Sequence, residues 1–285
     1  MSIFIAIADS TDPQIPGLVI PIAAAIALAV AVAIGVFRPR TILGPQRLSP
    51  EESPRVLIGT IGIALAAWAI CLFSLGVLHQ RLLQMRHEPL TSPFSGAETV
   101  VYGIIIDGAA FAAALAVSTV RPEGTRRLGI NLARIPRGLL GGICAIAIVL
   151  PLIDCVGGLT ELMLKWLHQA PPPHDLLQIF NEHPAPWLRV ADVLSACVVA
   201  PLAEEMFFRG LVQTALRYFL NRPWVAVFLT AGMFAMVHRW WTWPEIFFLG
   251  ICLGYAYERT GNLWMSITMH ALFNLTSIWL FVHFG

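Results

Sequence analysis

Long apolar runs separated by short polar segments dominate the pattern of residues along the chain. Most runs reach about 20 residues, the length at which a helix rising about 1.5 Å per residue crosses a bilayer core of about 30 Å. The pattern therefore predicts an all-α fold, a multi-pass transmembrane helical bundle of about eight helices. The predicted spans are Gly17–Phe37, Val56–Leu78, Thr99–Val120, Gly138–Leu159, Leu188–Phe219, Pro223–Trp241, Ile246–Tyr257 and Leu263–Phe284.

Two of these segments need separate comment. Ile246–Tyr257 is short for a regular span, so we expect it to be tilted, buried or only partly inserted. Gly17–Phe37 is preceded by two aspartates and followed by two arginines, which is the reverse of a cleaved secretory signal. We therefore expect this first segment to stay in the mature protein.

A proline-rich stretch divides the chain. Gln169–Pro186, with the sequence QAPPPHDLLQIFNEHPAP, lies between two apolar runs, and its proline density is typical of a linker. We therefore expect an N-terminal part, residues 1–186, that holds four transmembrane helices and this linker. The C-terminal part, residues 187–285, carries the charged motifs described below.

Composition agrees with a membrane protein. Hydrophobic residues make up 57% of the 285 positions and charged residues 12%, which is more apolar surface than one soluble core can bury. The net charge of +1 provides no basic or acidic face, so we expect the bilayer as a partner and no nucleic acid. The five cysteines have no metal-ligand spacing, and we interpret them as small hydrophobic residues. The use of 17 arginines and one lysine indicates a GC-rich, bacterial genome and hence the plasma membrane.

The stretch PLAEEMFFRG, residues 201–210, places three charges inside the fifth apolar run. An ionised carboxylate at mid-bilayer costs at least about 2.5 kcal/mol on insertion scales, so such groups usually face the bundle interior or a wet cavity. Glu205 and Arg209 are four residues apart with the acid first, which favours an ion pair on a helix. Glu204 points about 100° away, so we expect it to meet a group from another helix. Pro201 should kink this helix and free a backbone carbonyl.

Two acids in the N-terminal part stand alone. Asp107 and Asp154 have no charged residue three or four positions away. We interpret both as structural, either capping a helix or forming a hydrogen bond between helices.

Candidate partners for Glu204 lie further along the chain. FAMVH places Phe234 and His238 on one helical face, and HALFN does the same for His270 and Asn274, because residues four apart lie above one another. The recurrence of Glu, His, His and Asn on successive helices favours a functional site over packing histidines.

These residues resemble the motifs of the CAAX protease and bacteriocin-processing family of intramembrane proteases, also called the CPBP or Abi family, which includes the CAAX prenyl endopeptidases. Three family motifs are matched: EExxxR by Glu204, Glu205 and Arg209, FxxxH by Phe234 and His238, and HxxxN by His270 and Asn274. The similarity covers roughly residues 190–280 and includes two glycines, Gly250 and Gly254. The N-terminal part shows no matching motif.

The resemblance implies a helical multi-pass endopeptidase whose catalytic groups line a water-accessible cavity. Glu204 would correspond to the glutamate that activates the hydrolytic water, and His238 would help to hold that water. His270 and Asn274 would correspond to the pair that stabilises the oxyanion. Peptide hydrolysis needs both a base and such donors, and both are more effective in a site of low dielectric.

Glu205 and Arg209 match positions that we interpret as supporting the site. One alternative concerns a cofactor: Glu204, His238 and His270 with an open fourth position would also suit zinc. The chain has no HExxH motif, and we favour a glutamate mechanism without a cofactor over a zinc-dependent one.

A second functional class stays open at this point. Intramembrane glutamate and histidine are also used by proton-coupled transporters, and an inactive relative could serve as a bacteriocin-immunity or accessory factor. Against a transporter, the sequence shows no inverted repeat. The expected substrate of the protease is a membrane-anchored or lipidated protein or peptide, with its identity open.

Overall fold

The computed structural model describes residues 22–26, 29–30, 54–90, 95–119, 128–169 and 185–284. These residues form helices and connecting turns, without a strand among them, so the prediction of an all-α bundle of about eight helices is confirmed. The main elements are α3 (Pro54–Arg86), α4 (Gly96–Thr119), α6 (Ile135–Trp166), α8 (Pro186–Leu194), α9 (Ala200–Glu205), α10 (Thr214–Leu220), α11 (Pro223–Met236), α12 (Trp243–Thr260) and α13 (Leu263–Phe284).

Three segments of the described chain are long and apolar enough to cross a membrane. They are Ile58–Arg86, Leu132–Trp166 and Leu263–His283, and Pro223–Met236 is a shorter apolar helix. Their length and composition indicate an integral membrane protein. Of the predicted first span, only residues 22–26 and 29–30 are described, and they are helical. Residues 170–184 of the predicted linker lie outside the described residues.

Two helices differ in length from their predicted spans. α12 covers 18 residues, Trp243–Thr260, and is therefore longer than the short segment that its apolar positions indicated. Its ends carry Glu245 and Arg259, which a search for uncharged runs excludes. α11 ends at Met236, before the predicted end at Trp241, and a turn and a short 3-10 helix, Trp240–Thr242, connect it to α12.

The fifth predicted span is one continuous helical rod, residues 186–220, which we call the rod. Two of its segments are π-helical, Ser195–Val199 and Met206–Gln213. A π-helix bonds each carbonyl to the N–H five residues on, so it turns more widely than an α-helix. Such segments are rare and occur frequently at functional sites. Here they flank α9, the short α-helix that carries both glutamates of the motif.

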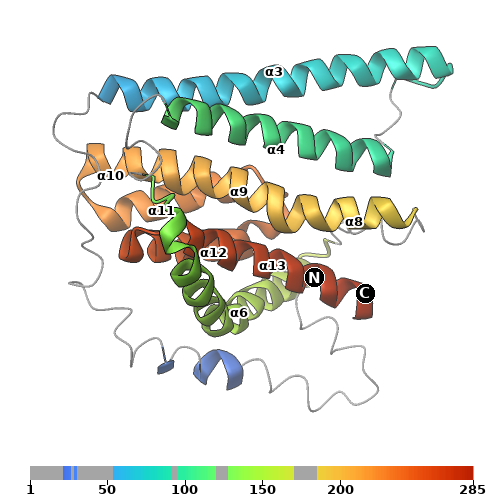
Figure 1. The fold of residues 1–285 in the computed structure, drawn as a ribbon. Coiled ribbons are helices and arrows are strands. Elements are labelled where there is room, and N and C mark those ends of the chain that lie inside the picture. The colour runs from blue at the N-terminus through green and yellow to red at the C-terminus, as the bar shows by residue number, and fades with distance from the viewer. Residues whose placement is uncertain are drawn as a thin grey trace.

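The rod lies between the pair α3 and α4 on one side and the other C-terminal helices on the opposite side (Figure 1). α3 packs on α4, and α4 packs along α9 on one side of the rod, while α11, α12 and α13 contact its other side. α6 crosses beneath α12 and α13 and packs on both. The N-terminal helices therefore contact the C-terminal part directly on two sides.

Glycines allow α6 to approach α13 closely. A Cβ added to Gly138 would lie 2.5 Å from the Cβ of Trp264, and one added to Gly142 would lie 2.6 Å from the Cβ of Thr268. These separations are far below a normal contact, so only glycine fits at these two positions. Small residues at such an interface allow the backbones to pack closely, which is a common way for helices to associate in lipid.

We predict that Gly142→Ala lowers the free energy of unfolding of the purified protein by about 1–3 kcal/mol, because the added methyl group overpacks the contact with α13. The neighbouring Gly141→Ala is the matched control. Its Cβ would meet only the flexible Met265 side chain, at 3.4 Å, and it gains up to about 1 kcal/mol of helix propensity. Thermal unfolding in detergent measures both, and equal stability of the two variants would contradict this packing.

Candidate active site

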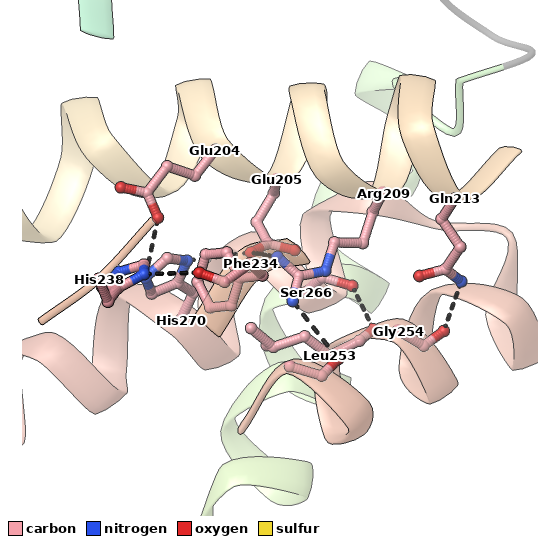
Figure 2. A network of polar contacts seen from close by, with 11 residues as sticks. Glu204, Glu205, Arg209, Gln213, Phe234, His238, Leu253, Gly254, Ser266 and His270 are labelled. Atoms are coloured by element: carbon pink, nitrogen blue, oxygen red, sulfur yellow. Dashed lines mark hydrogen bonds and ion pairs between the residues drawn. The ribbon is translucent and has the colours of Figure 1, made fainter. Parts of the chain in front are cut away.

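The side chains of the EExxxR motif leave the same face of the rod. Glu204 and Glu205 end α9, while Arg209 and Gln213 lie in the π-helical segment Met206–Gln213. Figure 2 shows all four side chains directed toward the helices that carry Phe234, Leu253 and His270. The wider π turn keeps positions four residues apart closer to one line than 3.6 residues per turn would.

Glu205 and Arg209 form a fully buried ion pair. Nη1 of Arg209 donates to Oε1 of Glu205 at 2.7 Å, and neither side chain has any exposed surface. Nη2 of Arg209 donates to the carbonyl oxygen of Gly250 on α12 at 3.4 Å. The guanidinium carbon also lies 4.4 Å from the centre of the Phe234 ring, within the range of a cation–π contact. The ion pair expected from the spacing is therefore present, and it contacts two other helices.

His270 connects the two glutamates. Its Nδ1 lies 3.0 Å from Oε1 of Glu205, and its Nε2 lies 3.8 Å from Oε2 of Glu204. Because Glu205 is ionised in its pair with Arg209, Nδ1 of His270 must carry the proton and donate. The two glutamates differ in burial: 25% of the Glu204 side chain is exposed, and none of the Glu205 side chain is. Glu204 is therefore the carboxylate that another molecule can reach.

His238 lies just beyond the end of α11 rather than within a helix. Its Nδ1 is 2.7 Å from the carbonyl oxygen of Phe234, and since a carbonyl only accepts, Nδ1 donates. The two rings are in contact, with centroids 4.7 Å apart. The ring of Phe234 also packs edge-on against His270, at 5.6 Å. The FxxxH spacing thus holds His238 on the carbonyl of Phe234, and the Phe234 ring contacts both imidazoles.

Asn274 is bound to the rod near its beginning, whereas Gln213 lies near its end. Its Nδ2 donates to the carbonyl oxygen of Ala196 at 2.7 Å. In the π-helical segment Ser195–Val199, that carbonyl would pair with the N–H of Pro201, which proline lacks. The freed carbonyl expected from Pro201 is therefore Ala196, and an amide from α13 satisfies it. One of the two N–H groups of Asn274 is committed to this bond.

Hydrogen bonds between the rod and α12 continue beyond the motif. Nε2 of Gln213 donates to the carbonyl oxygen of Gly254 at 3.0 Å and to Oε1 of Glu258 at 3.1 Å. A Cβ on Gly254 would lie 2.7 Å from Oε1 of Gln213, so glycine is needed there. The sequence interpretation did not include Gln213 or Glu258. The signal was the equal spacing of four in 205, 209, 213 and in 250, 254, 258.

The donors proposed for zinc do not form a metal site in this arrangement. Across the described residues, no three His, Cys, Asp or Glu side chains are placed so that they could hold a metal ion. We therefore derive no step through a metal.

Comparison with known proteins adds to this geometry. Residues 186–276 match the model of a family described as type II CAAX prenyl endopeptidase Rce1-like, so the C-terminal region contains a domain of this family and the resemblance seen in the motifs is confirmed. An uncharacterised protein of Bacillus subtilis strain 168, YpbD, is 31% identical over 94 residues, which is 33% of this chain and 44% of that protein. The chain thus spans less than half of that relative's length. No solved structure matches the chain.

We predict that Arg209→Met lowers the free energy of unfolding by about 3–5 kcal/mol, because it leaves the buried carboxylate of Glu205 without its main counter-charge. The double variant Glu205→Gln with Arg209→Met should recover part of this loss, since both charges are then removed. Arg259→Met is the control, since Arg259 is exposed and such sites contribute at most about 1 kcal/mol. Denaturation in detergent measures all three. Equal losses for Arg209→Met and Arg259→Met would show that the buried pair is not a structural requirement.

Proposed function

We propose that the protein is an intramembrane endopeptidase that hydrolyses peptide bonds of membrane-associated or lipidated substrates. The observation that carries this proposal is the partly exposed side chain of Glu204, whose Oε2 lies 3.8 Å from Nε2 of a buried His270, inside the region that matches the endopeptidase family. A reachable acid beside an oriented imidazole is the arrangement needed for acid–base chemistry on a peptide.

Glu204 acts as the general base in this proposal. Its Oε2 is buried and makes no hydrogen bond within the described residues, so it is available to take a proton from water. His238 is the proposed second contact for this water. Since its Nδ1 donates to Phe234, the Nε2 of a neutral ring carries a lone pair that accepts a hydrogen bond.

His270 and Asn274 stabilise the oxyanion. Because Nδ1 of His270 donates to Glu205, a donation from Nε2 requires the imidazolium, which carries both protons. Asn274 supplies the N–H that is not used by Ala196. Donors fixed by bonds on their other side cost little reorganisation when the carbonyl oxygen becomes negative. The proton held by Glu204 then passes to the leaving nitrogen as the C–N bond breaks.

Glu205 and Arg209 are the supporting pair. Their fully buried charges orient His270 and fix the rod against α12, and neither is exposed to a substrate. This division explains why the adjacent glutamates of the motif differ in partner and in burial. Glu204 is available for catalysis, whereas Glu205 is held in the buried ion pair.

The proposed location is the plasma membrane of a bacterium. The long apolar helices and the matching Bacillus protein support it, together with the arginine-rich composition. The proposed partner is a membrane-anchored or lipidated protein or peptide, because the site lies on helices of an integral membrane bundle.

We predict that Glu204→Gln lowers the rate of cleavage of a membrane-associated reporter peptide by about 10²-fold or more, since the amide cannot serve as a base. The protein should remain folded, because Glu204 makes no hydrogen bond in the described structure. Glu161→Gln, which removes an acid from a pair on α6 at 2.7 Å from Lys165, should leave cleavage unchanged. Wild-type cleavage by Glu204→Gln would refute the catalytic assignment. Proton flux into vesicles in the absence of cleavage would support a transporter instead.

We predict that cleavage by purified protein survives exhaustive treatment with a metal chelator, because the base and the oxyanion donors are side chains of the protein. The same sample is assayed before treatment, after treatment and after addition of zinc. Activity that is lost on chelation and restored only by zinc would overturn the glutamate mechanism.

A further inference from the structure

α4, in the N-terminal part, has a stripe of apolar residues along one face, and one acid, Asp107, lies within this stripe. Val100, Ile104, Phe111 and Leu115 are spaced by four or seven residues, so they lie on one face of the helix. Val100 and Ile104 belong to one apolar cluster, and Phe111 and Leu115 pack against another. Asp107 lies at the matching position between them. It therefore faces the same neighbour as the stripe does.

The contacts of the stripe fix the level of Asp107 along the rod. Val100 clusters with Leu188 at the start of α8, and a Cβ on Gly103 would lie 4.0 Å from Oγ of Ser195. Further along, Phe111 and Leu115 pack against a cluster that contains Met206 and Leu211.

α4 thus runs parallel to the rod, as Figure 1 also shows. Asp107 falls between the level of Ser195 and the level of Met206, which is the level of α9, Ala200–Glu205. Glu204 is the acid of α9 that is not committed to an ion pair with its own helix.

The charges around Glu204 come from several elements. His270 on α13 lies 3.8 Å from Glu204, Glu205 and Arg209 lie on its own rod, and Asp107 lies on α4, which packs along α9. The guanidinium of Arg209 lies against the ring of Phe234, which also contacts His238 after α11. Arg209 is already balanced by Glu205. Within the described residues Asp107 makes no hydrogen bond or ion pair, so its effect on Glu204 is that of a second, unbalanced carboxyl.

We propose that Asp107 is a positioning residue of the active site, which acts on Glu204 through its charge and makes that glutamate a stronger base. The proposal rests on the proposed function of Glu204. Two carboxyl groups near one another in a medium of low dielectric resist double ionisation, and their protons are released as a coupled pair. The N-terminal part would thereby contribute to an active site whose family match begins only at residue 186.

The test is Asp107→Asn, which removes the charge and keeps the shape. Because Glu204 loses a repelling neighbour, the acid limb of the profile of kcat/KM against pH should move to lower pH, and kcat at the plateau should fall on the order of 3- to 10-fold while KM stays unchanged. Relative activity at acid pH therefore rises as the plateau falls. A purely structural defect lowers activity without moving the limb. Asp107→Glu, which restores the charge, should return the limb toward its wild-type position.

Asp154→Asn is the matched control, since it makes the same change at a buried acid of α6, and its acid limb should coincide with that of the wild type. Asp107→Ser supplies a second neutral variant where the asparagine variant does not fold. If the acid limb of the profile of kcat/KM against pH does not move in a folded neutral variant of Asp107, the proposal is overturned. This holds even when Glu204→Gln is inactive and the proposed function stands. Cleavage by Glu204→Gln would instead refute the proposed function, so the two failures are distinguishable.

Discussion

One buried carboxylate holds the C-terminal part of this protein together. Oε1 of Glu205 accepts a hydrogen bond from Arg209 at 2.7 Å and another from His270 at 3.0 Å, which joins the rod to α13, while Arg209 reaches α12 through Gly250. A charge without a partner at this depth would be costly, so the carboxylate, the guanidinium and the imidazole constrain one another. The orientation of His270, and hence its approach to Glu204, follows from this constraint.

The same requirement explains the irregular backbone of the rod. In lipid, polar backbone groups must be satisfied within the protein. Pro201 removes one N–H, and Asn274 satisfies the carbonyl of Ala196 that is left. In the second π-helical segment, Oγ1 of Thr214 donates to the carbonyl oxygen of Arg209 at 3.1 Å, and it lies 3.2 Å from the hydroxyl of Tyr257. A side chain from α13 thus satisfies the rod at the first distortion, and a side chain of the rod itself does so at the second, so the departures from α-helix are held in place.

The sequence predicted what depends on local spacing and missed what depends on tertiary contact. The spacing of four was sufficient for the pair of Glu205 and Arg209, and apolar runs were sufficient for the helices. The predicted end of the sixth span at Trp241 was wrong, because α11 ends at Met236, and a span drawn from hydropathy alone continues through the tryptophans after it. Gln213 was missed because a lone glutamine has no local partner, and its bonds go to a helix about 41 residues further on.

Asp107 is a second example of a residue whose surroundings depend on tertiary contact and could not be predicted from the sequence. Seen in the sequence, it is an isolated acid in an apolar run, and a structural role was the natural interpretation. Its significance arises only from the parallel packing of α4 on the rod, where Gly103 meets Ser195 and Phe111 packs near Met206. The N-terminal part contributes to the site through helix faces, with α4 covering α9 and α6 supporting α13. A face can be formed by many sequences, whereas a base and its donors require particular residues. Recognisable motifs therefore gather in the C-terminal part, although α4 packs directly on the helix that carries Glu204.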